Sequence, residues 1–140
     1  MSEATRPYQH VQGAPRMLLR LEGLLVLLIG IGVFWKIAGG ALGWWGFVLF
    51  FAPDLSMTAY LAGPRFGALV YNSAHTYLAP AALAVAGFVV GAAGHAESAW
   101  WAPPLASLWA AHIGFDRLLG YGLKYPTGFG DTHLGRIGRA

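Results

Sequence analysis

The 140-residue chain contains no cysteine. Without thiolates it cannot form disulfides, cysteine-ligated zinc sites, iron–sulfur clusters or covalently attached c-type haem, and it has no thiol nucleophile. Charged residues are also scarce, at 11% of the chain, against about 25% in an ordinary soluble domain. Any chemistry at a site in this protein must therefore use oxygen and imidazole groups.

Hydrophobic residues make up 56% of the chain and aromatic residues 14%. A soluble domain of this length could not bury so much apolar surface. A bilayer core about 30 Å thick needs about 20 apolar residues per helix. Four stretches meet that length, at residues 17–35, 42–61, 66–92 and 98–121. The predicted fold is therefore all-α, a polytopic membrane protein whose four-helix transmembrane domain covers residues 17–121.

The distribution of charge predicts how these helices are oriented. The short connections between them favour antiparallel neighbours, and hence an up-down bundle. Lys36 is the only Lys or Arg expected on one side of the membrane, and basic residues mark the cytoplasmic side. Both termini are therefore expected inside, with residues 1–16 and 122–140 as cytoplasmic tails. Tryptophans cluster at the opposite ends of the helices, as an aromatic belt at the outer face of the membrane would, and this supports the same orientation. The belt consists of Trp35, Trp44, Trp45, Trp100 and Trp101.

The expected partners follow from the same features. The net charge is +3, but the basic residues are spread over loop ends and form no stripe, which argues against nucleic-acid binding. Membrane lipids are the expected surroundings. Gly87 and Gly91 form a G-x-x-x-G ridge on the third predicted helix, a pattern that allows close helix packing. This ridge predicts tight packing within the bundle, a homodimer, or docking to a larger membrane complex.

Ionisable residues within the predicted spans are the strongest functional signal, because they are costly in a membrane and usually face the interior. At 1.5 Å per residue, Asp54 and His75 both lie about 15 Å from the turn that joins their helices. Glu22 and His112 both lie roughly 18 to 20 Å below the outer tryptophans. Asp116 follows His112 by four residues and shares its helix face. All four helices thus carry ionisable groups at a comparable depth, in the cytoplasmic half.

Carboxylates and imidazoles that converge in a bundle core are the ligands of Fe, Mn or Zn sites. The sequence predicts one or two such ions bound by Asp54, His75, His112 and Asp116, with Glu22 as a further ligand or general base. A bound metal can activate water or oxygen. The leading hypothesis is a metal-dependent membrane enzyme that acts on a lipid-soluble substrate.

Other polar residues are expected to support the site or to contact the substrate. The segment 120–133 is rich in glycine and aromatic residues, which predicts either a lid over the cytoplasmic mouth or an interfacial tail. As part of a lid, its basic residues would face a substrate or lipid phosphates. The supporting residues are Asn72, Tyr71, Tyr60, Arg117, Lys124 and His133.

Two alternatives remain open at this point. In the first, the polar residues form a hydrogen-bonded network, with Asp116 paired to Arg117 or a histidine, inside an accessory subunit or a proton-conducting bundle. In the second, His75 and His112 are the axial ligands of a b-type haem, although the nearby carboxylates argue against it. His10 and His95 lie outside the predicted spans and are expected to contact solvent.

The chain also carries a set of motifs in a fixed order, which include Ala52-Pro53-Asp54-Leu55-Ser56, Gly63-Pro64-Arg65, Tyr71-Asn72-x-x-His75 and His112-Ile113-Gly114-Phe115-Asp116-Arg117. On these motifs the chain resembles a family of small bacterial integral membrane proteins known as domain of unknown function 4260. The resemblance covers about residues 16–134 and implies a four-helix fold in the bacterial inner membrane, but no substrate. Fold analogy does not supply a function, so the function must come from the site.

Overall fold

The computed structural model describes residues 8–138 and begins with one long helix. Helix α1 (Gly13–Leu42) has 30 residues, so it is about 45 Å long and exceeds the roughly 30 Å of a bilayer core. Its outer face is apolar, with Leu25, Leu28 and Ile29 each more than half exposed. An apolar face of this kind suits contact with lipid rather than water.

The second segment consists of two short helices. After a turn at Gly43, where φ is 49°, the chain forms α2 (Trp45–Phe50) and the 3₁₀ helix η1 (Ala52–Ala62). The sequence had predicted one continuous helix over 42–61. Pro53 stands at the start of η1, where its missing N–H costs nothing. Because residues three apart align in a 3₁₀ helix, Asp54 and Tyr60 share one face of η1.

A break divides the third segment, which had been predicted as one helix over 66–92. It consists of α3 (Pro64–Ala74) and α4 (Leu78–Ala92), which meet at an angle of 43°. Pro80 causes this break, because its ring clashes with the carbonyl four residues earlier and it cannot donate a hydrogen bond.

Side chains of α6 satisfy the carbonyls that the break leaves free. The indole Nε1 of Trp109 donates to the Ala74 carbonyl at 2.7 Å, and Arg117 Nη2 donates to the His75 carbonyl at 3.3 Å. Neighbouring helices commonly satisfy broken helices in membranes in this way. His75 is therefore held at the break itself.

Helix α6 (Ala102–Leu119) follows the short α5 (Ala96–Ala99) and forms the centre of the molecule, packed against α1, α2 and α4. Its closest neighbour is α1. A Cβ on Gly114 would lie 2.5 Å from the Gly23 carbonyl, and a Cβ on Gly30 would collide with the Ser107 carbonyl. Small residues thus let the two backbones meet. The predicted Gly87–Gly91 ridge also packs within the chain, with Gly87 against Ala102.

Two segments are long and apolar enough to cross a membrane, namely α1 and Trp45–Ala62, and the bent pair α3–α4 makes a third if it counts as one span. This indicates a membrane protein. The fourth predicted span, α6, does not meet the same criterion. It carries His112, Asp116 and Arg117 and is largely enclosed by other elements, so it needs less apolar surface.

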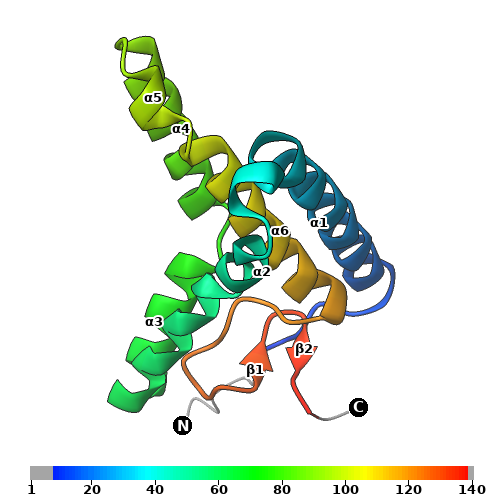
Figure 1. Cartoon of the computed structure of the whole chain (residues 1–140). Coiled ribbons are helices and arrows are strands. Elements are labelled where there is room, and N and C mark those ends of the chain that lie inside the picture. Colours follow the sequence, from blue (N-terminus) through cyan, green and yellow to red (C-terminus); the bar gives the residue numbers. More distant parts are fainter. Residues whose placement is uncertain (1–7, 139–140) are drawn as a thin grey trace, which may run out of the picture.

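The C-terminal segment is a folded unit at the end of the molecule where α1 begins (Figure 1). Strands β1 (Asp131–Thr132) and β2 (Gly135–Arg136) form an antiparallel hairpin. The hairpin is tied to the N-terminal residues, because Val11 N donates to the His133 carbonyl at 2.8 Å. His10 Nδ1 lies 2.6 Å from the Thr132 carbonyl oxygen, so the expectation of a solvent histidine was wrong for His10.

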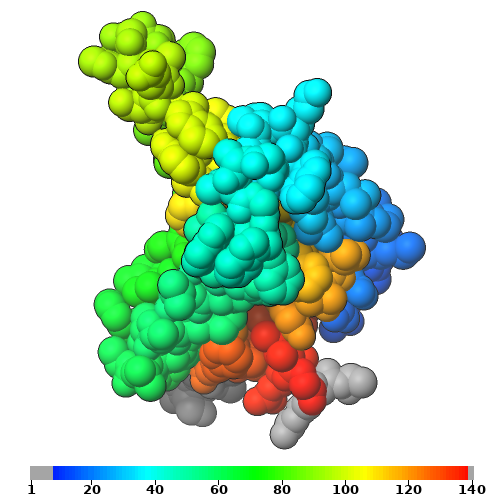
Figure 2. Space-filling model, in the orientation of Figure 1, coloured from blue at the N-terminus to red at the C-terminus, as the bar shows by residue number. Residues whose placement is uncertain are grey.

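The two ends of the molecule differ in how tightly they are packed. Figure 2 shows the α4–α5 end standing away from the rest of the chain, whereas the C-terminal segment lies directly under the helices. The turn between α1 and α2 also lies toward the α5 end (Figure 1). The exposed Trp44 and Trp45 follow that turn, and Trp100 and Trp101 follow α5.

Candidate metal site

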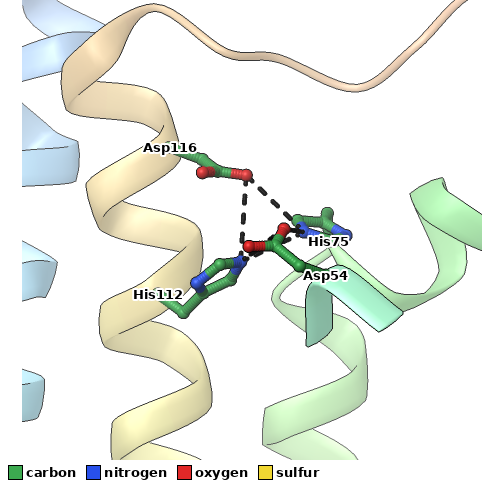
Figure 3. A group of neighbouring side chains, drawn as sticks. All are labelled: Asp54, His75, His112 and Asp116. Carbon is green, nitrogen blue, oxygen red and sulfur yellow. Dashed lines mark hydrogen bonds and ion pairs between the residues drawn. The ribbon is translucent and has the colours of Figure 1, made fainter. Parts of the chain in front are cut away.

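Four side chains converge between η1, the α3–α4 break and α6 (Figure 3). Asp54 comes from η1, His75 from the break, and His112 and Asp116 from adjacent turns of α6. One donor atom from each side chain lies within 4.8 Å of every other. The structure therefore brings together all four residues that the sequence singled out as metal ligands.

The donor atoms are evenly spaced. His75 Nε2 lies 3.2 Å from His112 Nε2, and both nitrogens lie 3.4 Å from Asp54 Oδ1. Asp116 Oδ2 is 3.5 Å from His75 Nε2 and 4.0 Å from His112 Nε2. The nitrogen–oxygen separations are longer than ordinary hydrogen bonds. Among the described residues, the buried Asp54 Oδ1 has no hydrogen-bond partner.

Tyr71 orients two of the four side chains. Its carbonyl lies 3.0 Å from His75 Nδ1 and can only accept, so Nδ1 carries the proton and the lone pair of Nε2 faces the other donor atoms of the group. Its hydroxyl donates to Asp116 Oδ2 at 3.0 Å. The Tyr71 and His75 rings also stack, with centroids 3.7 Å apart. Partners of this kind fix the tautomer and the orientation of metal ligands.

Exposure shows from which side the group can be reached. The side chains of His75 and His112 are only 3% and 1% exposed and that of Asp116 is 11%, but Asp54 is 32% exposed. Phe50 and Phe51 pack edge-on against the His112 ring and cover it. The group is therefore accessible mainly at Asp54.

The geometry does not accommodate a haem. Axial nitrogens on one iron lie on opposite faces of the porphyrin, so the ring would have to pass between the Nε2 atoms of His75 and His112, which are 3.2 Å apart. Two carboxylate oxygens also occupy the space beside them, at 3.4 to 4.0 Å. A macrocycle would collide with Asp54 and Asp116.

Glu22 does not join the other ionisable residues. It is exposed on α1 and is not a member of the four-residue group. Its neighbour Gly23 is buried against the backbone of α6. Because successive residues point about 100° apart around a helix, this contact turns Glu22 away from the tightest part of the interface.

Arg117 and His133 form a contact between α6 and the C-terminal segment. Arg117 Nη1 lies 3.3 Å from His133 Nε2, and the Leu123 N–H donates to His133 Nδ1 at 2.9 Å. Burial and the charge of Arg117 lower the pKa of His133. No ion pair joins Arg117 to Asp116 within residues 8–138, but His75 Nε2 and His112 Nε2 lie 3.5 and 4.0 Å from Asp116 Oδ2. Of the two pairings considered for the polar network, the structure therefore contains the one with histidine.

Lys124 and Tyr60 lie where the C-terminal segment meets η1, with the Lys124 ammonium 5.6 Å from the centroid of the Tyr60 ring. Lys124 is 4% exposed, and its ammonium donates to the Phe129 carbonyl at 2.9 Å. The ammonium also lies over the rings of Phe129 and Tyr71, at 3.2 and 4.6 Å from their centroids. Burial lowers the pKa of Lys124 to about 8.

Asn72 connects α3 to the backbone of the C-terminal segment. Its Nδ2 donates to the Lys124 carbonyl at 2.9 Å, and its Oδ1 accepts from the Lys124 N–H at 2.7 Å. The side-chain amide of Asn72 thus both donates to and accepts from the backbone of Lys124, which positions the C-terminal segment. These two bonds do not involve the four converging side chains.

Sequence reasoning missed Trp109 and the two phenylalanines that cover His112. Trp109 donates a hydrogen bond to the Ala74 carbonyl, next to His75, and lies on α6 one turn before His112. A signal for it existed, because it is the one tryptophan of six that lies outside the predicted belt. Phe50 and Phe51 carried no comparable signal among so many apolar residues.

One comparison with known proteins found a match. A family model described as domain of unknown function (DUF4260) matches residues 16–137, nearly the whole chain and all four converging side chains. No curated protein and no solved structure matches the chain.

Proposed function

Because the chain belongs to the family of domain of unknown function 4260, whose description states no activity, we propose from its site that it is a metal-dependent membrane enzyme acting on a lipid-soluble substrate. The observation that carries the proposal is the convergence of Asp54, His75, His112 and Asp116. Each donor atom is close to the other three, and two of the side chains are held in place by Tyr71.

The spacing fits tetrahedral coordination of a single ion. Ligand atoms about 2.0 to 2.2 Å from a tetrahedral metal lie about 3.3 to 3.6 Å from one another. Of the six donor-atom distances of the site, 3.2, 3.4, 3.4 and 3.5 Å agree with this. The distance of 4.0 Å from Asp116 to His112, and the Asp54–Asp116 distance, which is within 4.8 Å, would need Asp116 to move toward the other three. A metal ion would also give Asp54 Oδ1 the partner that it lacks.

The donor set limits the metal and its role. Two imidazoles and two carboxylates suit Zn, Fe or Mn. Such an ion would supply a Lewis acid or an activated water. On a tetrahedral ion this requires one position free of protein ligands, and Asp54, the most exposed of the four, is the ligand that would give up its position to water or substrate. In this chain His75, His112 and Asp116 would hold the ion from the buried side, and the more exposed Asp54 would form the side at which a substrate arrives.

Metal analysis tests the proposal. The detergent-purified protein is expected to contain about one Zn, Fe or Mn per chain, and His75→Ala and His112→Ala are expected to lose it. His95→Ala is the matched control, since His95 is exposed at the start of α5. A wild-type metal content far below one per chain that does not change in His112→Ala would refute a metal site.

A second candidate rests on the contact between the two histidines. Nε2 atoms 3.2 Å apart can share a proton, as in the polar network of a proton-conducting bundle or an accessory subunit of a membrane complex. This candidate predicts metal-free protein whose fold depends on both histidines. The same elemental analysis, with circular dichroism of the two alanine variants, separates the two candidates.

The proposed placement is a four-span bundle in the bacterial inner membrane with both termini cytoplasmic. It is supported by the basic residues near the start of α1 and in the C-terminal segment, and by the exposed tryptophans toward the opposite end. Reporter fusions at residue 95 and at the C-terminus test it. The residue-95 fusion should report the periplasm, and a cytoplasmic signal there would reverse the orientation.

A further inference from the structure

A mostly apolar cavity of about 390 Å³ lies between η1, the α3–α4 pair and α6. This volume falls within the roughly 300 to 1,000 Å³ of ligand-binding pockets, which are typically apolar with a few polar groups. Its wall includes Ala52, Pro53, Ala74, Leu105, Leu108 and Trp109.

The cavity wall and the four converging side chains are built from the same short segments. Pro53 directly precedes Asp54, Ala74 directly precedes His75, and Leu108 lies one helical turn before His112. Trp109 closes the wall rigidly, because its indole donates to the Ala74 carbonyl. A molecule in the cavity would therefore contact the backbone segments that carry three of the four converging side chains, although those side chains do not themselves line the wall.

A larger apolar cavity, of about 660 Å³, lies on the other side of His112. Phe50 and Phe51 form part of its wall, and their rings also pack against the imidazole, with centroids 5.2 and 6.2 Å away. These two rings separate the larger cavity from the donor atoms. The smaller cavity adjoins η1, which carries Asp54, the most exposed member of the group.

One polar atom interrupts the apolar wall of the smaller cavity. Ser56 Oγ is buried and has no hydrogen-bond partner among the described residues. A buried hydroxyl without a partner is costly, and a ligand oxygen would satisfy it if the Ser56 side chain turned its Oγ toward the cavity. The cavity therefore offers an apolar surface and one hydroxyl on η1, the helix that also carries Asp54.

We infer that this cavity binds the hydrocarbon chain of the substrate and directs an oxygen-containing head group to the Asp54 side of the metal site. The substrate class is a single-chain amphiphile, such as a long-chain fatty acyl compound. The inference rests on the proposed metal function, because the head group is assigned to the ion.

Alkyl hydroxamates are suitable probes, because the hydroxamate binds metal ions and the alkyl chain can be lengthened. The protein would be loaded with Co²⁺ in detergent, and binding followed by the visible spectrum of the ion. Affinity is expected to rise about fourfold per added methylene until the cavity is full. Leu105→Trp fills the cavity from α6, two turns away from His112, and Ile31→Trp is the matched control in the wall of the larger cavity.

The expected result is that Leu105→Trp binds acetohydroxamate as the wild type does but binds decylhydroxamate at least tenfold more weakly. In Ile31→Trp the affinity should still rise with the length of the alkyl chain as it does in the wild type. This variant also controls for partition of the hydroxamate into detergent micelles. Leu83→Trp narrows the same cavity from α4 and provides a second test should Leu105→Trp not fold.

The failures of the two proposals are distinguishable. If both cavity-filling variants bind decylhydroxamate as tightly as the wild type, the hydrocarbon chain does not occupy this cavity, and the metal site stands. If the wild type binds no Co²⁺, the proposed metal function fails, and this inference fails with it.

Discussion

The Tyr71 hydroxyl donates a hydrogen bond to Asp116 Oδ2 over 3.0 Å, although the two residues are 45 positions apart in the chain. Asp116 is buried on α6, and Tyr71 is 1% exposed on α3. The bond therefore holds the Asp116 side chain of α6 in place from α3. The backbone carbonyl of the same residue, Tyr71, also orients His75.

Tyr71→Phe removes this bond and keeps the ring that stacks on His75. Because partners of metal ligands typically change metal affinity 10- to 100-fold, we expect Zn²⁺ affinity to fall by about that factor. Competition with a chromogenic chelator would measure it. Tyr121→Phe, at an exposed tyrosine, is the control; equal affinities in the two variants would mean that Tyr71 does not support the site.

Glu22→Gln should leave the metal content unchanged. The structure places Glu22 on the exposed surface of α1, outside the group of four converging side chains. The variant can be compared with Asp54→Asn by elemental analysis, since Asp54→Asn is expected to reduce binding. A loss of metal in Glu22→Gln as large as that in Asp54→Asn would restore Glu22 to the ligand set.

Gly30→Ala should destabilise the protein by about 1 to 3 kcal/mol, the usual cost of overpacking. Its new Cβ would meet the Ser107 carbonyl and Ala111 on α6. Gly32→Ala is the matched control two residues away, because a Cβ there meets nothing within 4 Å. Thermal unfolding in one detergent would compare them, and equal midpoints would show that α1 and α6 do not meet at Gly30.

Acidification should weaken the attachment of the C-terminal segment through His133. Burial and the charge of Arg117 lower the pKa of His133, so the folded protein keeps it neutral where the unfolded chain binds a proton. The stabilising contribution is therefore present above the unfolded pKa of about 6.5 and is lost as the pH falls below it.

His133→Asn removes the titrating group and keeps an acceptor for the Leu123 N–H. The free energy of unfolding of the wild type should fall more steeply between pH 7.5 and 5.5 than that of the variant. Denaturant titrations at the two pH values would measure this difference. Parallel pH dependence in both proteins would show that His133 does not contribute.

The sequence predicted that four side chains converge because depth along a helix can be counted. Asp54, His75, His112 and Asp116 were placed at one level by their distance from turns and tryptophans, and the structure brings them together. Counting residues does not give the rotation of a helix about its own axis, and this rotation decides which neighbour a side chain faces. Glu22 lies at a suitable depth, but the packing of Gly23 on α6 decides which way its side chain faces.

The broken helices and the hairpin were harder to predict. Pro80 indicated a kink, but the separation of α3 from α4 also depends on Trp109 and Arg117, which satisfy the freed carbonyls from a distant helix. The hairpin has strands of only two residues, too short to show an alternating pattern. Its position depends on partners such as Val11, which lie at the other end of the chain.

The pairing of α1 with α6 sets the order in which the protein can be completed during synthesis. About 60 residues separate the end of α1 from the start of α6, and translation at about 5 to 20 residues per second takes roughly 3 to 12 seconds to cross them. Throughout that interval the glycine face of α1 has been made and its partner has not. Until α6 is made, lipid or the insertion machinery must therefore cover Gly23 and Gly30 of α1. Helix α6 then displaces whatever covers these glycines.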